Sequence, residues 1–263
     1  YGVITSASIG DLFIAGIVPG LLMSFLMMGT VFLISQVRGY AGGNAFHVRA
    51  LAVSIWNGKY SLMMPVIVLG GIYTGMVTPV EAAVVAVLYA LVVAMLVKRT
   101  LTFRGLWDCF TESSTVCGGL TIIMGTAVLF GEYMTMNMIP QSLAAFIIEF
   151  VSSKYTLLII ICIFLLIIGT FMETLATTMI LTPILLPVIT TFDIDVIQFG
   201  VIMVVTNAIG MLTPPLGLNL FVACNLTGLS LEQVSSQVIP FICALILGLA
   251  LIAFIPWLSL VLL

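Results

Sequence analysis

The chain has 263 residues, of which 62% are apolar and 6% are charged, and its formal net charge is −3. An ordinary soluble domain is about 25% charged, so this composition excludes a soluble globular protein. The mean hydropathy of +1.35 excludes a disordered chain, and the lack of clustered basic residues excludes a nucleic-acid-binding protein. The apolar runs are continuous and do not alternate as barrel strands do, which predicts an all-α polytopic membrane protein.

The first 115 residues contain long apolar runs separated by basic segments. One run covers about residues 12–35, and a second covers residues 60–97 between basic flanks. Short loops rich in Lys and Arg stay in the cytoplasm, so the second run should form two helices that enter and leave the membrane on one side. Glycines and a proline at residues 70–79 supply the turn between them. The polar stretches at 44–59 and 107–115 are expected to be short helices in the membrane interface.

The next interrupted run predicts a hairpin. Apolar residues 156–168 and 179–189 flank the polar sequence GTFMETLATT at residues 169–178. Each apolar run is shorter than the roughly 20 residues that a spanning helix needs. We therefore expect a re-entrant hairpin at about residues 156–190 with a polar tip.

A second break predicts a discontinuous helix. Apolar residues 196–209 and 218–224 flank the sequence GMLTPPLG at residues 210–217. Two consecutive prolines cannot continue a regular helix, because each lacks the backbone N–H group that the helix requires. We expect a broken helix at about residues 196–225.

A similarity between the two ends of the chain points to a duplicated fold. Asp11 stands eight residues before Pro19, and Glu232 stands eight residues before Pro240. A short polar lead-in precedes each acid, and an apolar span follows, the later one at about 236–262. Many transporters consist of inverted repeats with the binding site at the repeat interface.

The two polar breaks predict a cation-binding site. An unpartnered backbone group in hydrocarbon costs several kcal/mol, so each break needs protein, water or a bound ion as a partner. Hard cations prefer oxygen ligands, and the carbonyl ends of helices favour cations. If the hairpin tip meets the broken helix, their carbonyl and hydroxyl oxygens can surround one Na⁺ ion. A carboxylate substrate could rest against the N–H ends of the half-helices.

Glu173 has two interpretations. It is the only carboxylate between Glu149 and Asp193, and an ionisable side chain at membrane depth is a functional candidate. Alternatively, Glu173 caps the second half of the hairpin and faces water. Thr78 and Glu81 have the spacing of a capping box, which favours a structural role for Glu81.

No sequence pattern for nucleotide or hydrolytic chemistry occurs in the chain. There is no GxxxxGK[ST] loop for ATP and no HExxH or GxSxG motif. The sequence therefore predicts that the protein is not an enzyme and does not itself use ATP.

Three stretches resemble the large membrane subunit of TRAP transporters, the tripartite ATP-independent periplasmic transporters. The sequence GGIYTGMVTPVEAA at residues 70–83 is similar to the family signature GGIYSGxxTPTEAA. The sequences ATTMILTPILLP at 176–187 and LTPPLGLNLFV at 212–222 also resemble that family. The resemblance covers nearly the whole chain, but only the C-terminal part of the subunit.

The resemblance implies Na⁺-coupled import of a carboxylate, such as sialic acid or a C4-dicarboxylate, across the bacterial inner membrane. It implies an elevator-type, ion-transporter-like fold of two inverted repeats, each with a re-entrant hairpin and a discontinuous helix. The implied partners are a periplasmic substrate-binding protein, a small four-helix membrane subunit (separate or fused), the N-terminal half of the same large subunit, and the lipid bilayer. Residues 1–115 would form scaffold and arm helices and the end of the first repeat, and residues 116–263 the second repeat of the transport domain.

The residues and the resemblance together give one site assignment. We expect Na⁺ to be coordinated by residues of the hairpin and the broken helix, namely Gly169, Thr170, Glu173, Thr174, Gly210, Thr213 and Pro214. Thr177 and Asn219 are weaker candidates for facing the substrate. A passive ion or solute channel subunit is the alternative function, because a channel can also use backbone breaks as a filter.

Overall fold

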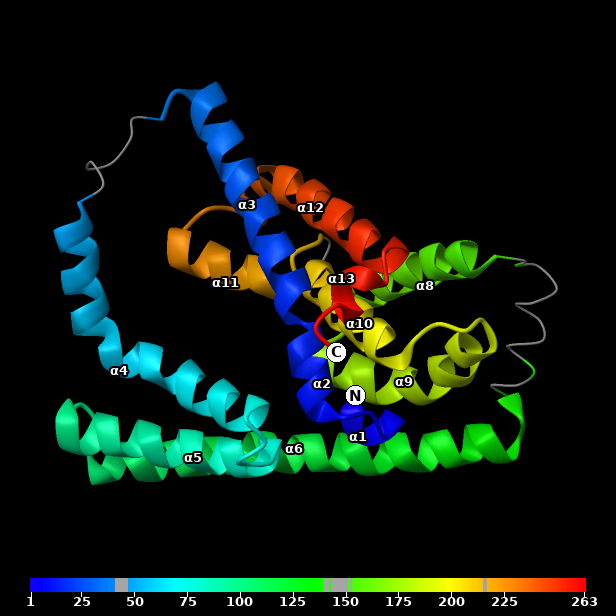
Figure 1. The fold of residues 1–263 in the computed structure, drawn as a ribbon, viewed down its shortest axis with the longest axis horizontal. Coiled ribbons are helices and arrows are strands. Elements are labelled where there is room, and N and C mark those ends of the chain that lie inside the picture. The colour runs from blue at the N-terminus through cyan, green and yellow to red at the C-terminus, as the bar shows by residue number, and fades with distance from the viewer. Residues whose placement is uncertain (41–46, 140–141, 143–150, 152, 215–216) are drawn as a thin grey trace. The chain divides into compact units, whose positions relative to one another are not determined.

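The computed structural model describes residues 1–40, 47–139, 142, 151, 153–214 and 217–263, which form helices joined by turns (Figure 1). The predicted all-α class is therefore confirmed. The chain divides into two compact units, one of residues Tyr1–Gly39 with Ile122–Leu263 and one of residues Tyr40–Thr121. Residues 1–39 thus group with the C-terminal half, whereas the functional division at residue 115 stays a prediction.

The unit of residues 40–121 contains a helical pair. Helices α4 (Val48–Tyr73) and α5 (Pro79–Val92) pack together, and the Tyr89 hydroxyl donates to the Tyr60 carbonyl oxygen at 2.8 Å. The expected turn between them is confirmed. The capping box is confirmed as well, because the Glu81 carboxylate accepts from the Thr78 N–H at 2.8 Å and the Glu81 N–H donates to the Thr78 hydroxyl.

Two expected interfacial helices are not separate elements. The segment expected at 44–59 belongs, from residue 48 onward, to the 26 residues of α4. The segment at 107–115 lies inside α6 (Phe103–Met136). A short π-helix, η1 (Val93–Val97), follows α5. The prediction of separate helices was wrong because polar side chains alone do not interrupt the backbone hydrogen bonds of a helix, and α4 continues even through Pro65.

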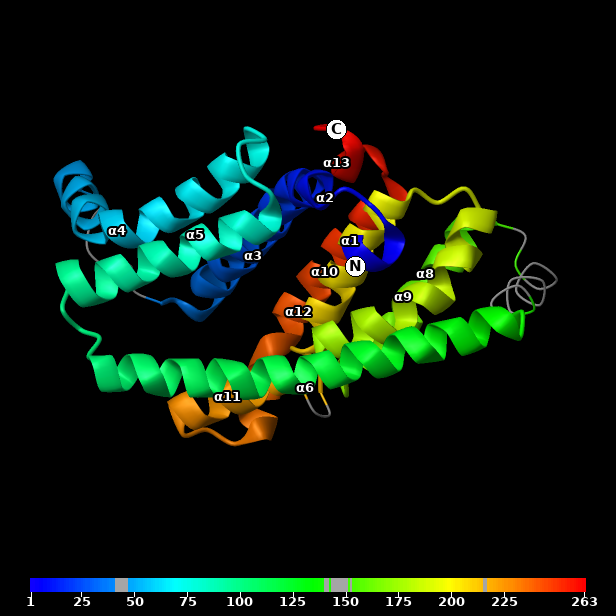
Figure 2. The same ribbon diagram turned by 90° about the horizontal axis from the view of Figure 1, so that it is seen from below.

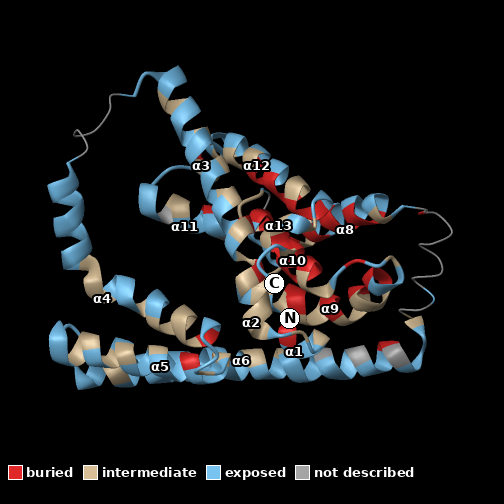
Figure 3. Ribbon diagram, in the orientation of Figure 1, coloured by how far each residue is buried: buried red, intermediate tan, exposed pale blue. Residues whose placement is uncertain are grey.

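The larger unit carries the core. Its helices besides the end of α6 are α1 (Gly2–Thr5), α2 (Ile9–Ala15), α3 (Ile17–Arg38), α8 (Lys154–Gly169), α9 (Thr174–Thr191), α10 (Val196–Gly210), α11 (Leu218–Thr227), α12 (Leu231–Phe254) and α13 (Trp257–Leu260). Helix α10 lies between the α8–α9 pair and α12 in both ribbon views (Figures 1 and 2). Buried residues gather on these helices (Figure 3), with Phe199, Ile202 and Met203 of α10 completely buried.

Helices α8 and α9 form an antiparallel hairpin. The turn of residues 170–173 joins them at one end, and the Lys154 ammonium donates to the Asp193 carbonyl oxygen at 2.9 Å at the other. Helices α8, α9 and α10 have 16, 18 and 15 residues, and the side chains of Glu173 and Asp195 cap the starts of α9 and α10.

Within the part of the chain that the structure describes, six helices are long and apolar enough to cross a membrane. The predicted polytopic membrane protein is therefore confirmed. Helices α8 and α10 are apolar but shorter, at about 24 and 22 Å by the usual helical rise, against a hydrocarbon core of about 30 Å. Both end at a buried glycine, Gly169 and Gly210. The re-entrant placement, the inverted repeat and the elevator-type fold stay predictions.

Candidate functional site

Four helix ends meet where the hairpin contacts the broken helix. Helices α8 and α10 end at Gly169 and Gly210, and α9 and α11 begin a few residues later. A methyl group added to Gly210 would lie only 2.7 Å from the Cα atom of Gly169, so the two backbones touch. The Gly217 N–H group also donates to the Thr170 carbonyl oxygen at 3.4 Å. We refer to residues 169–174, 210–214 and 217 as the helix-end junction.

The junction combines opposite ends of helix dipoles. The carbonyl ends of α8 and α10 each carry about half a negative elementary charge, and the N–H ends of α9 and α11 carry the opposite charge. N–H groups of the following turns donate to some of these oxygens, among them those of Ile168 and Gly210. The two carbonyl ends still repel each other, and a positive charge between or beside them would reduce the repulsion. The arrangement therefore suits a cation at the Gly169–Gly210 contact and an anion at the N–H end of α11, which has no side-chain cap.

The threonine hydroxyls of the site have oxygen lone pairs to offer. Thr170 and Thr213 each donate to a carbonyl oxygen in the preceding turn of the chain at 2.8 Å. Thr177 does the same at 3.0 Å, and Thr174 donates to the Met211 sulfur at 3.2 Å. A hydroxyl has one hydrogen and two lone pairs, so each oxygen that has used its hydrogen presents only acceptor capacity to a ligand.

Glu173 caps helix α9. One carboxylate oxygen accepts from the N–H groups of Leu175 and Ala176 at 3.0 and 3.3 Å, and the side chain is exposed. The structure therefore has the capping arrangement that was one of the two interpretations. A role as Na⁺ ligand stays a prediction, since a capping carboxylate still has a second oxygen.

A cavity of about 350 Å³ brings three of the predicted residues together. Thr170, Thr213 and Pro214 line it, with apolar side chains of α8 and α12 such as Leu166 and Ile242.

The two candidate substrate-facing residues differ in their exposure. Thr177 is completely buried in α9, and Asn219 is exposed at the start of α11.

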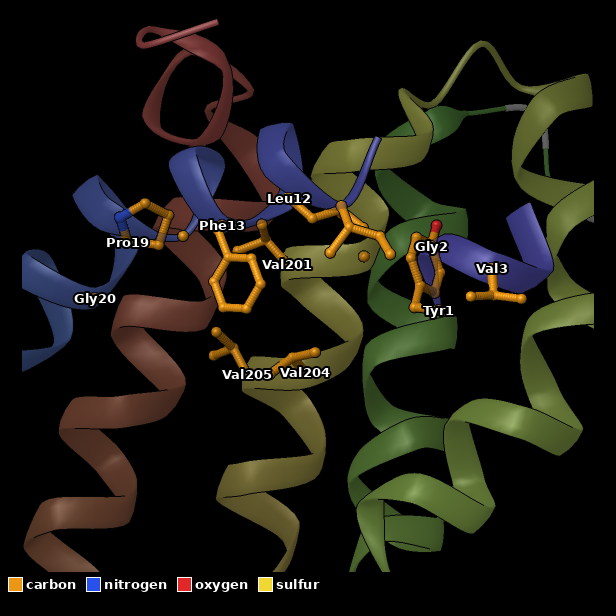
Figure 4. A pocket seen from close by; sticks show the side chains of 13 residues that line it. Tyr1, Gly2, Val3, Leu12, Phe13, Pro19, Gly20, Val201, Val204 and Val205 are labelled. Atoms are coloured by element: carbon orange, nitrogen blue, oxygen red, sulfur yellow. The ribbon is translucent and has the colours of Figure 1, made fainter. Parts of the chain in front are cut away.

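A larger apolar pocket lies elsewhere in the same unit. It has a volume of about 470 Å³ and is lined by α1, α2, α3 and α10. Figure 4 shows Leu12, Phe13, Val201 and Val205 around it. A site for an organic anion needs convergent polar groups, and the lining side chains of this pocket are almost entirely apolar. The helix-end junction is therefore the better candidate for transport chemistry.

The available donors favour an alkali cation over a transition metal. The described residues contain no group of three or more His, Cys, Asp or Glu side chains that could hold a metal. Backbone carbonyl groups and hydroxyls, by contrast, are hard neutral oxygen donors of the kind that hard cations accept.

Sequence reasoning missed Asn207. Its Cα atom would lie 3.4 Å from a methyl group on Gly169, so Asn207 borders the junction, and its side chain is buried. The available signal was an amide residue in the apolar sequence VIQFGVIMVVTNAIG, one turn before the break at Gly210. Because Asn207 stands inside a helix and not at a break, the sequence pattern alone does not distinguish it from a structural amide such as Gln198.

Comparison with known proteins identifies the sequence family. The family described as "Tripartite ATP-independent periplasmic transporter, DctM component" matches residues 1–258. The isethionate TRAP transporter permease protein DctMQ of Oleidesulfovibrio alaskensis is 41% identical over 97% of this chain and 40% of its own length. The C4-dicarboxylate TRAP transporter large permease protein DctM of Pseudomonas aeruginosa is 38% identical, and the sialic acid TRAP transporter large permease protein SiaM of Vibrio cholerae is 35% identical. Each of these two matches covers the whole of this chain and 61% of the relative.

These matches confirm the resemblance to a TRAP large membrane subunit. The chain spans 40 to 61% of the length of these three relatives.

Proposed function

The chain belongs to the DctM component of the tripartite ATP-independent periplasmic transporter family, and we propose that it is the part of a permease that couples Na⁺ entry to the import of a small organic acid. The family makes it part of a multi-pass protein of the bacterial inner membrane and a transporter subunit, not an enzyme. In this proposal residues 116–263 form the second repeat of an elevator-type transport domain.

The observation that supports Na⁺ coupling most strongly is the contact between Gly169 and Gly210. It joins two carbonyl helix ends in the buried part of the unit, where their partial negative charges are poorly screened. Neutral hydroxyl oxygens of Thr170 and Thr213 stand beside them with their hydrogens already donated. A monovalent cation offsets this charge, and no carboxylate other than Glu173 lies within the junction.

The substrate in this proposal is an organic acid anion. The relatives are named for isethionate, C4-dicarboxylate and sialic acid, which are all acids. The junction sequence contains no Lys or Arg, and the Glu173 carboxylate already occupies the N–H end of α9. The N–H end of α11, where no side-chain cap is formed, is therefore the group that would bind the acid. Of the two candidate side chains, Asn219 is exposed near that end and would contact the acid, whereas Thr177 is completely buried in α9.

The partners in this proposal follow from the family. They are a periplasmic substrate-binding protein that delivers the acid, a small four-helix membrane subunit, the N-terminal half of the large subunit, and the lipid bilayer. The small subunit is separate or fused. A passive channel is less favoured, because the family and the relatives described above are named as transporters. A channel would pass solute without a Na⁺ gradient.

The test uses the full permease in proteoliposomes with its binding protein and an imposed Na⁺ gradient. We expect Thr170→Ala, Glu173→Gln and Thr213→Ala to reduce Na⁺-driven uptake. A lost contact to a charged group costs about 1.5–3 kcal/mol, so the half-saturating Na⁺ concentration should rise roughly ten- to a hundredfold.

Thr190→Ala is the matched control. Thr190 lies at the far end of α9, is exposed, and donates to a carbonyl oxygen one turn back at 3.0 Å, as the junction threonines do. Its removal should leave uptake unchanged. Unchanged Na⁺ dependence in all three junction variants would contradict the proposed function.

A further inference from the structure

Asn207 is a buried amide without partners. Its side chain is 1% exposed, and neither its Oδ1 nor its Nδ2 atom has a hydrogen-bond partner among the described residues. A buried polar group left unsatisfied costs about 1–3 kcal/mol, and most such groups in native proteins are paired. An amide in this state at a functional junction requires a physical explanation.

The helix face that carries Asn207 is turned toward the hairpin. Residues three and four apart lie on one face of a helix, so Asn207 shares its face with Met203, Gly210 and Met211. The sulfur atoms of Met203 and Met211 accept from threonine hydroxyls of α9, at 3.5 and 3.2 Å. The backbone of Gly210 touches the end of α8. The Asn207 side chain therefore lies between the broken helix and the hairpin.

The other buried amide of α10, Gln198, differs at its nitrogen: its Oε1 atom also has no hydrogen-bond partner among the described residues, but its Nε2 atom has two. The Gln198 Nε2 atom donates to the carbonyl oxygens of Ile252 and Ala253 at 3.2 Å each. These bonds tie the start of α10 to the end of α12, so Gln198 has a structural role. Asn207 makes no such tie, although it stands on the same helix and is equally buried.

We propose that the Asn207 side chain completes the cation site, with its Oδ1 atom as an oxygen ligand beside the Gly169–Gly210 contact. This inference rests on the proposed Na⁺ coupling. An amide oxygen is a hard neutral donor, as backbone carbonyl and threonine hydroxyl oxygens are. The bound cation then gives the buried Oδ1 atom a partner and removes the free-energy cost of leaving it unpaired. Asn207 would also couple cation binding to the packing of α10 on the hairpin.

The experiment measures thermal unfolding of the purified full-length permease in Na⁺ and in choline at equal ionic strength. Asn207→Leu replaces the amide by an apolar side chain of similar shape, which can be neutral or stabilising where a polar group was unpaired. We expect its Tm in choline to equal or exceed that of the wild type. The increase in Tm that Na⁺ gives the wild type should be lost, with a rise of about tenfold or more in the half-saturating Na⁺ concentration.

Two further variants separate the atoms of the amide. Asn207→Asp keeps an oxygen at the Oδ1 position and removes the N–H₂ group, so we expect it to retain a Na⁺ response. Asn207→Ala removes both atoms with less bulk than Leu, and it should lose the response as Asn207→Leu does. Gln198→Leu is the control on the same helix: it should lower Tm in both buffers and keep the Na⁺ increment.

The outcomes distinguish this inference from the function on which it rests. A wild-type permease whose Tm does not respond to Na⁺ overturns the Na⁺ coupling and this inference with it. A wild type that responds, with Asn207→Leu and Asn207→Ala that respond equally, overturns the role of Asn207 alone. A loss of Tm in choline with an unchanged Na⁺ increment also overturns it, because that pattern belongs to a structural amide.

Discussion

At the scale of the residue, two glycines allow the helix ends to touch. Any side chain at Gly210 would meet backbone atoms of Gly169, the nearest at 2.7 Å, and backbone cannot move aside as a flexible side chain can. Glycine is needed where two backbones approach this closely. Glycine at the end of a helix costs little stability, whereas a methyl group at this position would force the two helix ends apart.

Gly210→Ala should therefore impair both stability and transport. Overpacking against a rigid neighbour costs about 1–3 kcal/mol, and the shift that relieves it separates the carbonyl ends at the proposed cation site. We expect a lower Tm of the full permease and weaker Na⁺-driven uptake in proteoliposomes.

Gly29→Ala is the control for that prediction. Among the described atoms, nothing lies within 4 Å of a methyl group at Gly29, in the middle of α3. Alanine there should be neutral or stabilise the helix by up to about 1 kcal/mol. If Gly210→Ala kept the uptake and the Tm of the wild type, the contact between the backbones of Gly169 and Gly210 would have no role in transport or stability.

At the scale of the element, short helices depend on their caps. Asp195 caps α10 by accepting from the N–H groups of Ile197 and Gln198 at 2.9 Å each, as Glu173 caps α9. These caps compensate N–H groups that have no partner within the helix. The cap of α10 lies at the opposite end from Gly210, so stability and cation binding can be changed separately on one helix.

Asp195→Ala should lower the free energy of unfolding by about 1 kcal/mol, because the first turn of α10 loses its acceptor. Asp195→Asn keeps an acceptor and should lose less. The half-saturating Na⁺ concentration of either variant should match the wild type, since the change lies about 22 Å along the helix from Gly210. Thermal unfolding and Na⁺-dependent uptake measure the two effects, and a large change in Na⁺ dependence would contradict the separation.

At the scale of the whole molecule, the larger unit joins segments that are far apart in the chain. Helix α3 packs on α12, where a methyl group at Gly248 would lie 2.5 Å from the Met23 sulfur and 2.8 Å from a methyl carbon of Leu26. The small residue lets the two helices approach, and residues 1–39 thereby become part of the unit that holds the junction.

Gly248→Leu should weaken that packing. A bulky side chain cannot fit against Met23 and Leu26 without separating α3 from α12, at a cost of about 1–3 kcal/mol. We expect a lower Tm, measured on the full permease in detergent. Gly248→Ala should cost less, because the flexible side chain of Met23 can move aside. Equal Tm values for Gly248→Leu and the wild type would contradict the packing described here.

The sequence by itself determined the class of the protein and the positions of its breaks. Composition excludes a soluble fold. Helices α8 and α10 end at Gly169 and Gly210 because of local features of the sequence: glycine or proline residues, and the limited length of each apolar run. The capping box of Thr78 and Glu81 was predictable for the same reason. The polar residues at 44–59 and 107–115 led to a wrong prediction of separate helices. Polar side chains alone do not end a helix, because they leave its backbone hydrogen bonds intact.

Only the tertiary structure decided which breaks meet and which polar groups remain unpaired. The contact of Gly169 with Gly210 and the burial of Asn207 depend on how α10 packs between the hairpin and α12. Spacing along the chain carries no information about contacts between separate helices, because these are set by side-chain packing across the whole unit. The local sequence thus determines which oxygen atoms are available for the proposed cation site, and the tertiary packing determines that they lie close together.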